Sequence, residues 1–177
     1  MTIQPKFIRR YLPPKDHLAA IGAVAVMWTA IEGLMESTIL GLYEIDLGRG
    51  LVLTNGLSFH ARMSLLRILA GEGAITDKAL AEEMKLILPR LDAGFGDRNT
   101  IVHGLWGPSE KPETIRRRTI RARGKKLQTV TQDYSSADLW AIADGLAELA
   151  TDFADLAHRL KIEDRLRTAP RHSSISK

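Results

Sequence analysis

Cysteine is absent from the 177-residue chain, and aromatic residues make up only 6% of it. A chain without thiols forms neither disulfides nor thiolate-bound metal sites, which fits a reducing cytoplasm. Long hydrophobic runs are also missing: the longest uncharged apolar run covers residues 18–31, 14 residues, whereas a membrane-spanning helix needs about 20. Basic residues precede this run as in a secretory signal, but Pro13, Pro14 and Asp16 interrupt that pattern. We therefore expect a cytoplasmic protein that makes no use of a membrane.

Metal-binding patterns are missing as well. The sequence has no His-x-His, no His-Glu-x-x-His and no tight carboxylate cluster with a histidine. We expect no metal and no other cofactor.

The positive charge of the chain is concentrated in one short segment. Residues 114–126 carry seven basic and no acidic side chains, whereas the rest of the chain carries 18 basic and 21 acidic ones. Such a patch attracts polyanions by releasing their counterions, but a solvated surface hairpin has the same composition. The candidate nucleic-acid-binding residues are those of this segment: Arg116, Arg117, Arg118, Arg121, Arg123, Lys125 and Lys126.

The hydrophobic pattern predicts an all-α fold, an antiparallel up-down four-helix bundle, with a β-hairpin inserted between its last two helices. Residues 1–15 form an irregular arm closed by two prolines, and residues 16–167 form a single domain. The first three helices are expected at 16–45, at 58–70 and from 76 to 103, with a glycine-rich break at 48–56. Pro89 should kink the third helix or divide it in two.

The second half of the chain contains the hairpin and the last helix. Residues 113–132 are rich in β-branched residues, with the turn expected at 123–125. Ser135 and Asp138 resemble a capping box at the start of the last helix, and the residues after 168 are expected to form a disordered tail. The last helix has a heptad stripe of large apolar residues beside an alanine stripe. The leucine stripe favours packing within the chain. The alanine stripe is compatible either with such packing or with a dimer interface.

The stretch GDRNTIVHGLW, residues 96–106, places an arginine, an asparagine and a histidine within six residues, at the end of a helical pattern. Asn99 and His103 are four apart and share one face of a regular helix. Arg98 lies about 140° around the helix from His103. The two can act together only if the backbone departs from a regular helix there, or if two subunits share the site.

This trio suits the cleavage of RNA. The 2′-OH of RNA supplies the nucleophile, histidine exchanges protons near neutral pH, and arginine binds a phosphate through two parallel hydrogen bonds. Asparagine can orient the imidazole or donate to a phosphate oxygen. The spacing alone is weak evidence, because Arg167 and His172 have the same gap in the predicted tail.

The pattern Arg-Asn-x-x-x-His at a helix end resembles the HEPN superfamily (higher eukaryote and prokaryote nucleotide-binding domains), in a bacterial branch where His-Gly follows the Arg-Asn. The resemblance covers most of residues 16–167 and implies candidate catalytic residues Arg98, Asn99 and His103. It further implies a metal-independent endoribonuclease that acts as a homodimer, with RNA as substrate. Many members of the superfamily belong to toxin–antitoxin or antiviral systems, so the resemblance also implies an antitoxin protein as a partner. The alternative is a catalytically inactive dimeric module that binds a nucleotide or partner protein. In a purely structural interpretation, His103 caps the helix end.

Overall fold

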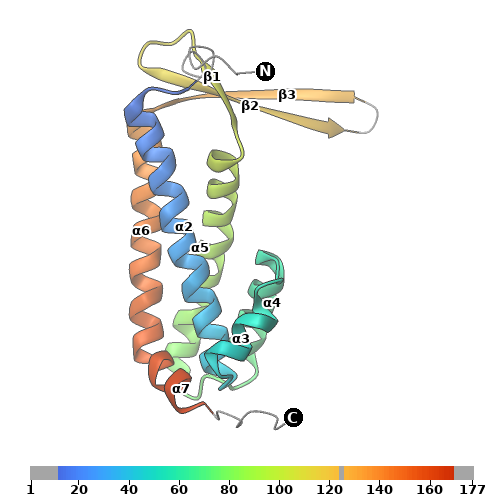
Figure 1. Cartoon of the computed structure of the whole chain (residues 1–177), viewed down its shortest axis with the longest axis vertical. Helices are drawn as coiled ribbons and strands as arrows, with labels where there is room; N and C mark the ends of the chain where they lie inside the picture. The colour runs from blue at the N-terminus through green and yellow to red at the C-terminus, as the bar shows by residue number, and fades with distance from the viewer. Residues whose placement is uncertain (1–11, 124–125, 170–177) are drawn as a thin grey trace, which may run out of the picture. The chain divides into compact units, whose positions relative to one another are not determined.

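The computed structural model describes residues 12–123 and 126–169. In these residues the protein is mostly helical, with a small antiparallel sheet (Figure 1). The helices are α2 (Lys15–Leu42), α3 (Leu47–Thr54), α4 (Phe59–Gly71), α5 (Lys78–Val102), α6 (Ser136–Arg159) and α7 (Ile162–Thr168). The strands are β1 (Leu105–Pro108), β2 (Thr114–Arg123) and β3 (Lys126–Ser135). The expectation of four helices was therefore too low, because the described part of the chain has six. The predicted arm before residue 12 and the tail from 170 lie outside the described residues.

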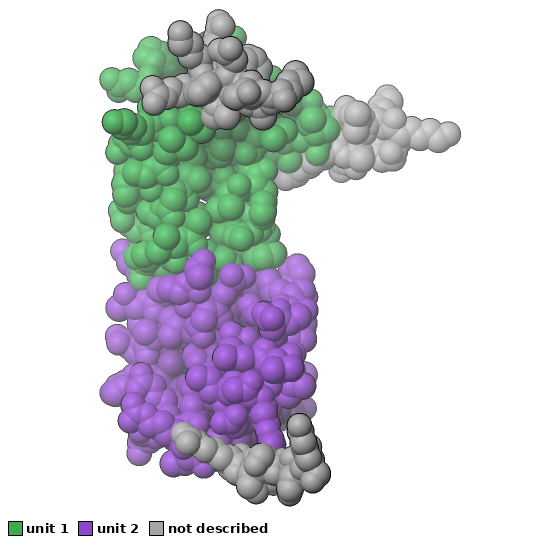
Figure 2. Space-filling view, viewed as in Figure 1, with its two compact units in different colours: residues 1–28, 94–147 green, residues 29–93, 148–177 purple. Residues whose placement is uncertain are grey.

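The chain forms two compact units (Figure 2). Unit 1 consists of residues 1–28 and 94–147, and unit 2 of residues 29–93 and 148–177. The sheet and the Arg-Asn-x-x-x-His motif both belong to unit 1. The helices α3, α4 and α7 belong to unit 2, while α2, α5 and α6 contribute to both.

The start of α6 confirms the predicted capping box. The backbone N–H of Ser135 donates to the Asp138 carboxylate at 2.8 Å, and the N–H of Asp138 donates to the Ser135 hydroxyl at 3.1 Å. Most of the heptad stripe is buried: Leu139, Leu146, Leu149, Phe153, Leu156 and Leu160, with Ile142 half-buried. Of the alanine stripe, Ala143 and Ala157 are buried and Ala154 is exposed.

The segment expected to be a glycine-rich break contains a helix instead, α3. Asp46 caps it by accepting a hydrogen bond from the backbone N–H of Arg49 at 3.2 Å. A Cβ on Gly50 would lie 2.5 Å from Leu40 Cδ2. Gly50 therefore permits a close helix contact and does not end a helix. The glycine content of residues 48–56 was for this reason misinterpreted as a break.

Of the two alternatives expected at Pro89, the division into two helices was wrong, since α5 is a single helix of 25 residues with Pro89 inside it; the kink stays a prediction. Pro89 is exposed, and it has no N–H to donate to the backbone carbonyl one turn before it. Within unit 1, the Phe95 ring of α5 packs against Trp28 of α2 at 5.8 Å between centroids.

The sheet has the order β1-β2-β3, and its first strand was not predicted. The expected hairpin is present as β2 and β3, although β3 continues to Ser135; the centre of its predicted turn, residues 124–125, lies outside the described residues. In the register, Arg117 pairs with Trp106 and Gln132, and Arg116 pairs with Gly107 and Asp133. Arg117 and Arg116 therefore point to opposite faces of the sheet.

In the described part of the chain, one helix is long and apolar enough to cross a membrane by length and composition, α2. This is weak evidence for a membrane span, because the core helix of a soluble protein passes the same test.

Candidate functional site at the end of α5

The three motif residues contact one another within a single chain. The Nη1 atom of Arg98 lies 2.8 Å from His103 Nε2 and 2.9 Å from Asn99 Oδ1. His103 is exposed, while Arg98 and Asn99 are half-buried. The arrangement thus presents a guanidinium and an imidazole together at the surface of unit 1.

The end of α5 explains how residues that point in different directions on a regular helix can meet. The helix ends at Val102, and His103 lies in the following turn, where its backbone N–H still donates to the Asn99 carbonyl at 3.3 Å. The long arginine side chain spans the remaining angle. Arg98 and His103 therefore meet within one chain at the point where α5 ends.

The contact determines which nitrogen of His103 carries a proton. Arginine has only donors, so Nε2 must accept the hydrogen bond from Arg98 and carry its lone pair there. In a neutral imidazole the proton then sits on Nδ1. A phosphate that draws Arg98 away would release the Nε2 lone pair, which is the group that a general base needs.

The sheet holds the last turn of α5 from one side. The indole Nε1 of Trp106 donates to the Ile101 carbonyl at 3.1 Å, and Nη1 of Arg117 donates to the Thr100 carbonyl at 3.3 Å. These carbonyls belong to the group that a helix C-terminus leaves without partners. Trp106 also packs edge-on against Tyr134 at 5.6 Å between ring centroids.

Of the predicted nucleic-acid-binding residues, the structure exposes Arg118 but buries Arg117, with 7% of its surface accessible. Arg117 was predicted to bind an RNA backbone, but its side chain is turned inward and does not offer its guanidinium to a ligand at the surface. Arg121, Arg123 and Lys126 lie at described strand positions, but their side chains, and Lys125 as a whole, are outside the described residues.

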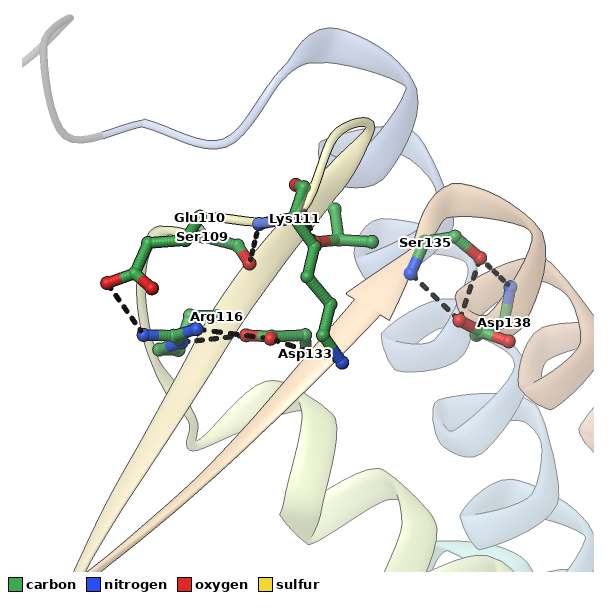
Figure 3. Close-up of polar contacts among 8 residues, drawn as sticks. Ser109, Glu110, Lys111, Arg116, Asp133, Ser135 and Asp138 are labelled. Carbon is green, nitrogen blue, oxygen red and sulfur yellow. Dashed lines mark hydrogen bonds and ion pairs between the residues drawn. The ribbon is translucent and has the colours of Figure 1, made fainter.

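Arg116 is engaged by acidic side chains on the other face of the sheet (Figure 3). Its Nε lies 2.7 Å from Asp133 Oδ1, and its Nη1 lies 3.9 Å from Glu110. The hydrogen bond from Arg116 lowers the pKa of Asp133, and the same bond raises the pKa of Arg116. A phosphate would have to compete with Asp133, so Arg116 contributes less positive charge to a ligand than the sequence indicates.

The interior face of the sheet has a different electrostatic character. The pKa of Tyr134 is raised, mainly because its hydroxyl is buried, while the nearby Arg117 acts in the opposite direction. Desolvation also raises the pKa of Asp97, although the residue as a whole is exposed.

Among the described residues, no ion pair joins a carboxylate to Arg98 or to Arg117. Their positive charges are therefore not neutralised within that part of the chain.

Within the described ranges, no three His, Cys, Asp or Glu side chains are grouped so that they could hold a metal ion. Comparison with protein-family models, with curated proteins and with solved structures finds no match.

Sequence reasoning missed the role of three residues at the end of α5. Trp106 and Arg117 reach the end of α5 from the sheet, and Gly104 gives Arg117 room. The glycine directly after the motif histidine was a signal for a close approach, but the sequence does not show which side chain approaches.

Proposed function

We propose that the protein is a metal-independent endoribonuclease in which His103 moves the proton and Arg98 binds the scissile phosphate. The observation that carries the proposal is the exposed contact of Arg98 Nη1 with His103 Nε2 at 2.8 Å, with Asn99 Oδ1 on the same guanidinium nitrogen. A histidine that lay in the core would lack this exposure.

The reaction proceeds in steps that balance without a metal or cofactor. The phosphate takes hydrogen bonds from Arg98, and the freed Nε2 of His103 accepts the proton of the RNA 2′-OH. The 2′ oxygen attacks phosphorus, the bond to the 5′ oxygen breaks, and a cyclic 2′,3′-phosphate forms. The leaving 5′ oxygen takes its proton from a general acid, which in a homodimer is His103 of the partner subunit. The guanidinium stabilises the negative charge that accumulates on the phosphate oxygens.

The biological setting proposed is a toxin or defence component, and an antitoxin protein is a further partner in that case. Expression of the wild-type protein and of His103→Ala in bacteria tests this setting. Growth inhibition by the wild type alone supports it, and equal growth of both strains contradicts it.

The alternative is a catalytically inactive dimeric module that uses the same three residues to bind a nucleotide or partner protein. It is favoured by the engagement of Nε2 by Arg98, which leaves the imidazole without a free acceptor until a ligand moves the guanidinium. RNA cleavage separates the two functions, since the module would bind without producing new ends.

The decisive experiment incubates the purified protein with RNA in the presence of EDTA. We expect cleavage that yields cyclic 2′,3′-phosphate and 5′-hydroxyl ends, and no cleavage where a 2′-deoxynucleotide replaces the ribonucleotide. Arg98→Ala and His103→Ala should each abolish it, while Arg90→Ala, an exposed arginine of α5 in unit 2, should not. Activity that requires a metal, or that survives both motif substitutions, would refute the proposal.

A further inference from the structure

One arginine of the basic segment does not face solvent. Arg117 lies on the helix-facing side of β2, paired with Trp106 in β1 and Gln132 in β3, and 7% of its surface is accessible. Its Nη1 donates to the Thr100 carbonyl at 3.3 Å, and its buried Nε has no partner among the described residues. Burying an arginine is costly, so a specific contact must compensate for it.

The space for Arg117 is provided by Gly104, the residue after His103. A Cβ at position 104 would lie 2.7 Å from Arg117 Cγ, 2.9 Å from its Cδ and 3.1 Å from the Thr100 carbonyl oxygen. Among the described glycines, Gly73 is the one with a positive φ. The backbone conformation at Gly104 therefore does not call for a glycine. Position 104 therefore requires glycine for space, and the arginine stem fills the place of a side chain.

The contact acts on the last turn of α5. Thr100 is three residues before His103, and its carbonyl is one of those that a helix end leaves without a backbone donor. A cation at a helix C-terminus is also favoured by the helix dipole. Arg117 thus contacts the turn at the Thr100 carbonyl and at Gly104, two neighbouring places that have His103 between them in the sequence.

We propose that Arg117 is a positioning residue that fixes the end of α5, so that Nε2 of His103 faces the guanidinium of Arg98. It touches neither substrate nor reacting atoms, and it acts through the backbone at Thr100 and Gly104. The inference deepens the proposed function and rests on it for its catalytic consequence, but its structural consequence at His103 can be measured without any substrate.

The test measures the protonation tautomer of the His103 imidazole by nitrogen-15 NMR, with the signals assigned by their loss in His103→Gln. In the wild type we expect the proton on Nδ1, because Nε2 accepts from Arg98. Arg117→Met removes the guanidinium and retains an apolar stem, and we expect it to shift the imidazole toward the Nε2-protonated tautomer. Arg117→Lys keeps a donor that can reach Thr100 and should preserve the wild-type signals.

Arg118→Met is the matched control, since it removes the same charge from the neighbouring, exposed position on the other face of β2. We expect no tautomer change there. Gly104→Ala provides a second perturbation of the same contact, and it remains available if Arg117→Met does not fold. Unchanged His103 signals in the folded variants Arg117→Met and Gly104→Ala would overturn the inference.

A double-mutant cycle checks that Gly104 acts through Arg117. Arg117→Ala removes the Cγ and Cδ atoms that a Cβ at 104 would meet. Gly104→Ala should then alter the His103 signals less in the Arg117→Ala background than in the wild type. Strictly additive effects would contradict the proposed contact.

Kinetics separate this inference from the proposed function. If the wild type cleaves RNA, Arg117→Met should lower kcat about tenfold or more with little change in KM, because small misplacements at a reacting centre are costly. Arg118→Met should instead act on KM. If the wild type cleaves no RNA while the tautomer shifts as expected, the nuclease proposal fails and the positioning role of Arg117 stands.

Discussion

At the scale of single residues, Arg98 is the side chain on which the proposed chemistry depends. One of its nitrogens contacts both Asn99 and His103, at 2.9 and 2.8 Å. A guanidinium can keep one such contact and still offer other donors to a phosphate, because it carries five N–H groups in a fixed plane. An ammonium group has the same charge without this geometry.

Arg98→Lys should therefore lower kcat/KM for RNA about 100-fold, because it loses the planar donor arrangement that stabilises the charge of the transition state. Single-turnover cleavage of a short labelled RNA measures the change, with Arg90→Lys as the control for an arginine away from the site. Wild-type rates in Arg98→Lys would show that charge alone suffices and that the paired hydrogen bonds do not matter.

At the scale of secondary-structure elements, the junction of β3 and α6 is organised by the capping box of Ser135 and Asp138 (Figure 3). The side-chain hydrogen bond from Ser135 is the main cause of the lowered pKa of Asp138. A carboxyl group whose folded-state pKa is depressed stabilises the fold above its unfolded value, and this contribution is lost as the pH falls through the folded-state pKa. The junction is thus expected to weaken in acid.

Asp138→Ala should lower the free energy of unfolding at pH 7 by about 1 kcal/mol, because it removes the carboxylate that accepts the hydrogen bond from the Ser135 backbone N–H. The difference from the wild type should shrink once the pH falls below 3.8, the ordinary pKa of the carboxyl group. Urea unfolding at several pH values measures it. Asp144→Ala, an exposed aspartate farther along α6, should show no comparable effect. A difference that grows toward low pH would contradict the role of the carboxylate.

At the scale of the whole molecule, the proposed reaction requires a second protonating group. The described part of unit 1 brings one histidine to Arg98, and a balanced reaction needs a general acid as well as a base. A homodimer with two-fold symmetry would supply His103 twice. The basic segment, with Arg117 buried and Arg116 paired to Asp133, leaves Arg118 as its exposed cation among the side chains that the structure describes.

Excess His103→Ala protein should therefore inhibit the wild type. Mixed dimers would contain a single His103 imidazole, so cleavage per wild-type chain should fall as the variant is added. An unrelated protein at the same concentration should have no effect. Light scattering confirms that dimers form at the concentrations used. Constant activity per wild-type chain, with mixed dimers present, would mean that each subunit acts alone.

Local patterns were sufficient for much of the fold. The helix starts at Ser58 and Ser135, the stripe of α6 and the hairpin rich in β-branched residues were predictable because caps, periodicity and β propensity depend on near neighbours. Local reasoning failed at Gly50, where it treated a glycine as a helix end, and at Pro89 it was wrong to allow a division of the helix. At Gly50 tertiary contact decides, since Leu40 lies against the glycine.

The side chains available for chemistry follow from the amino-acid order alone, because Arg98, Asn99 and His103 lie close together along the chain whatever the fold. Their mutual contact was decided by the tertiary structure, because it depends on where α5 ends and on the strands that pack against that end. The same holds for Arg117, which composition assigns to a polyanion and the fold assigns to the interior. Strand direction and register determine which face of the sheet a side chain takes. Part of that register comes from pairing with β1, whose four residues carry no sequence pattern that predicts a strand.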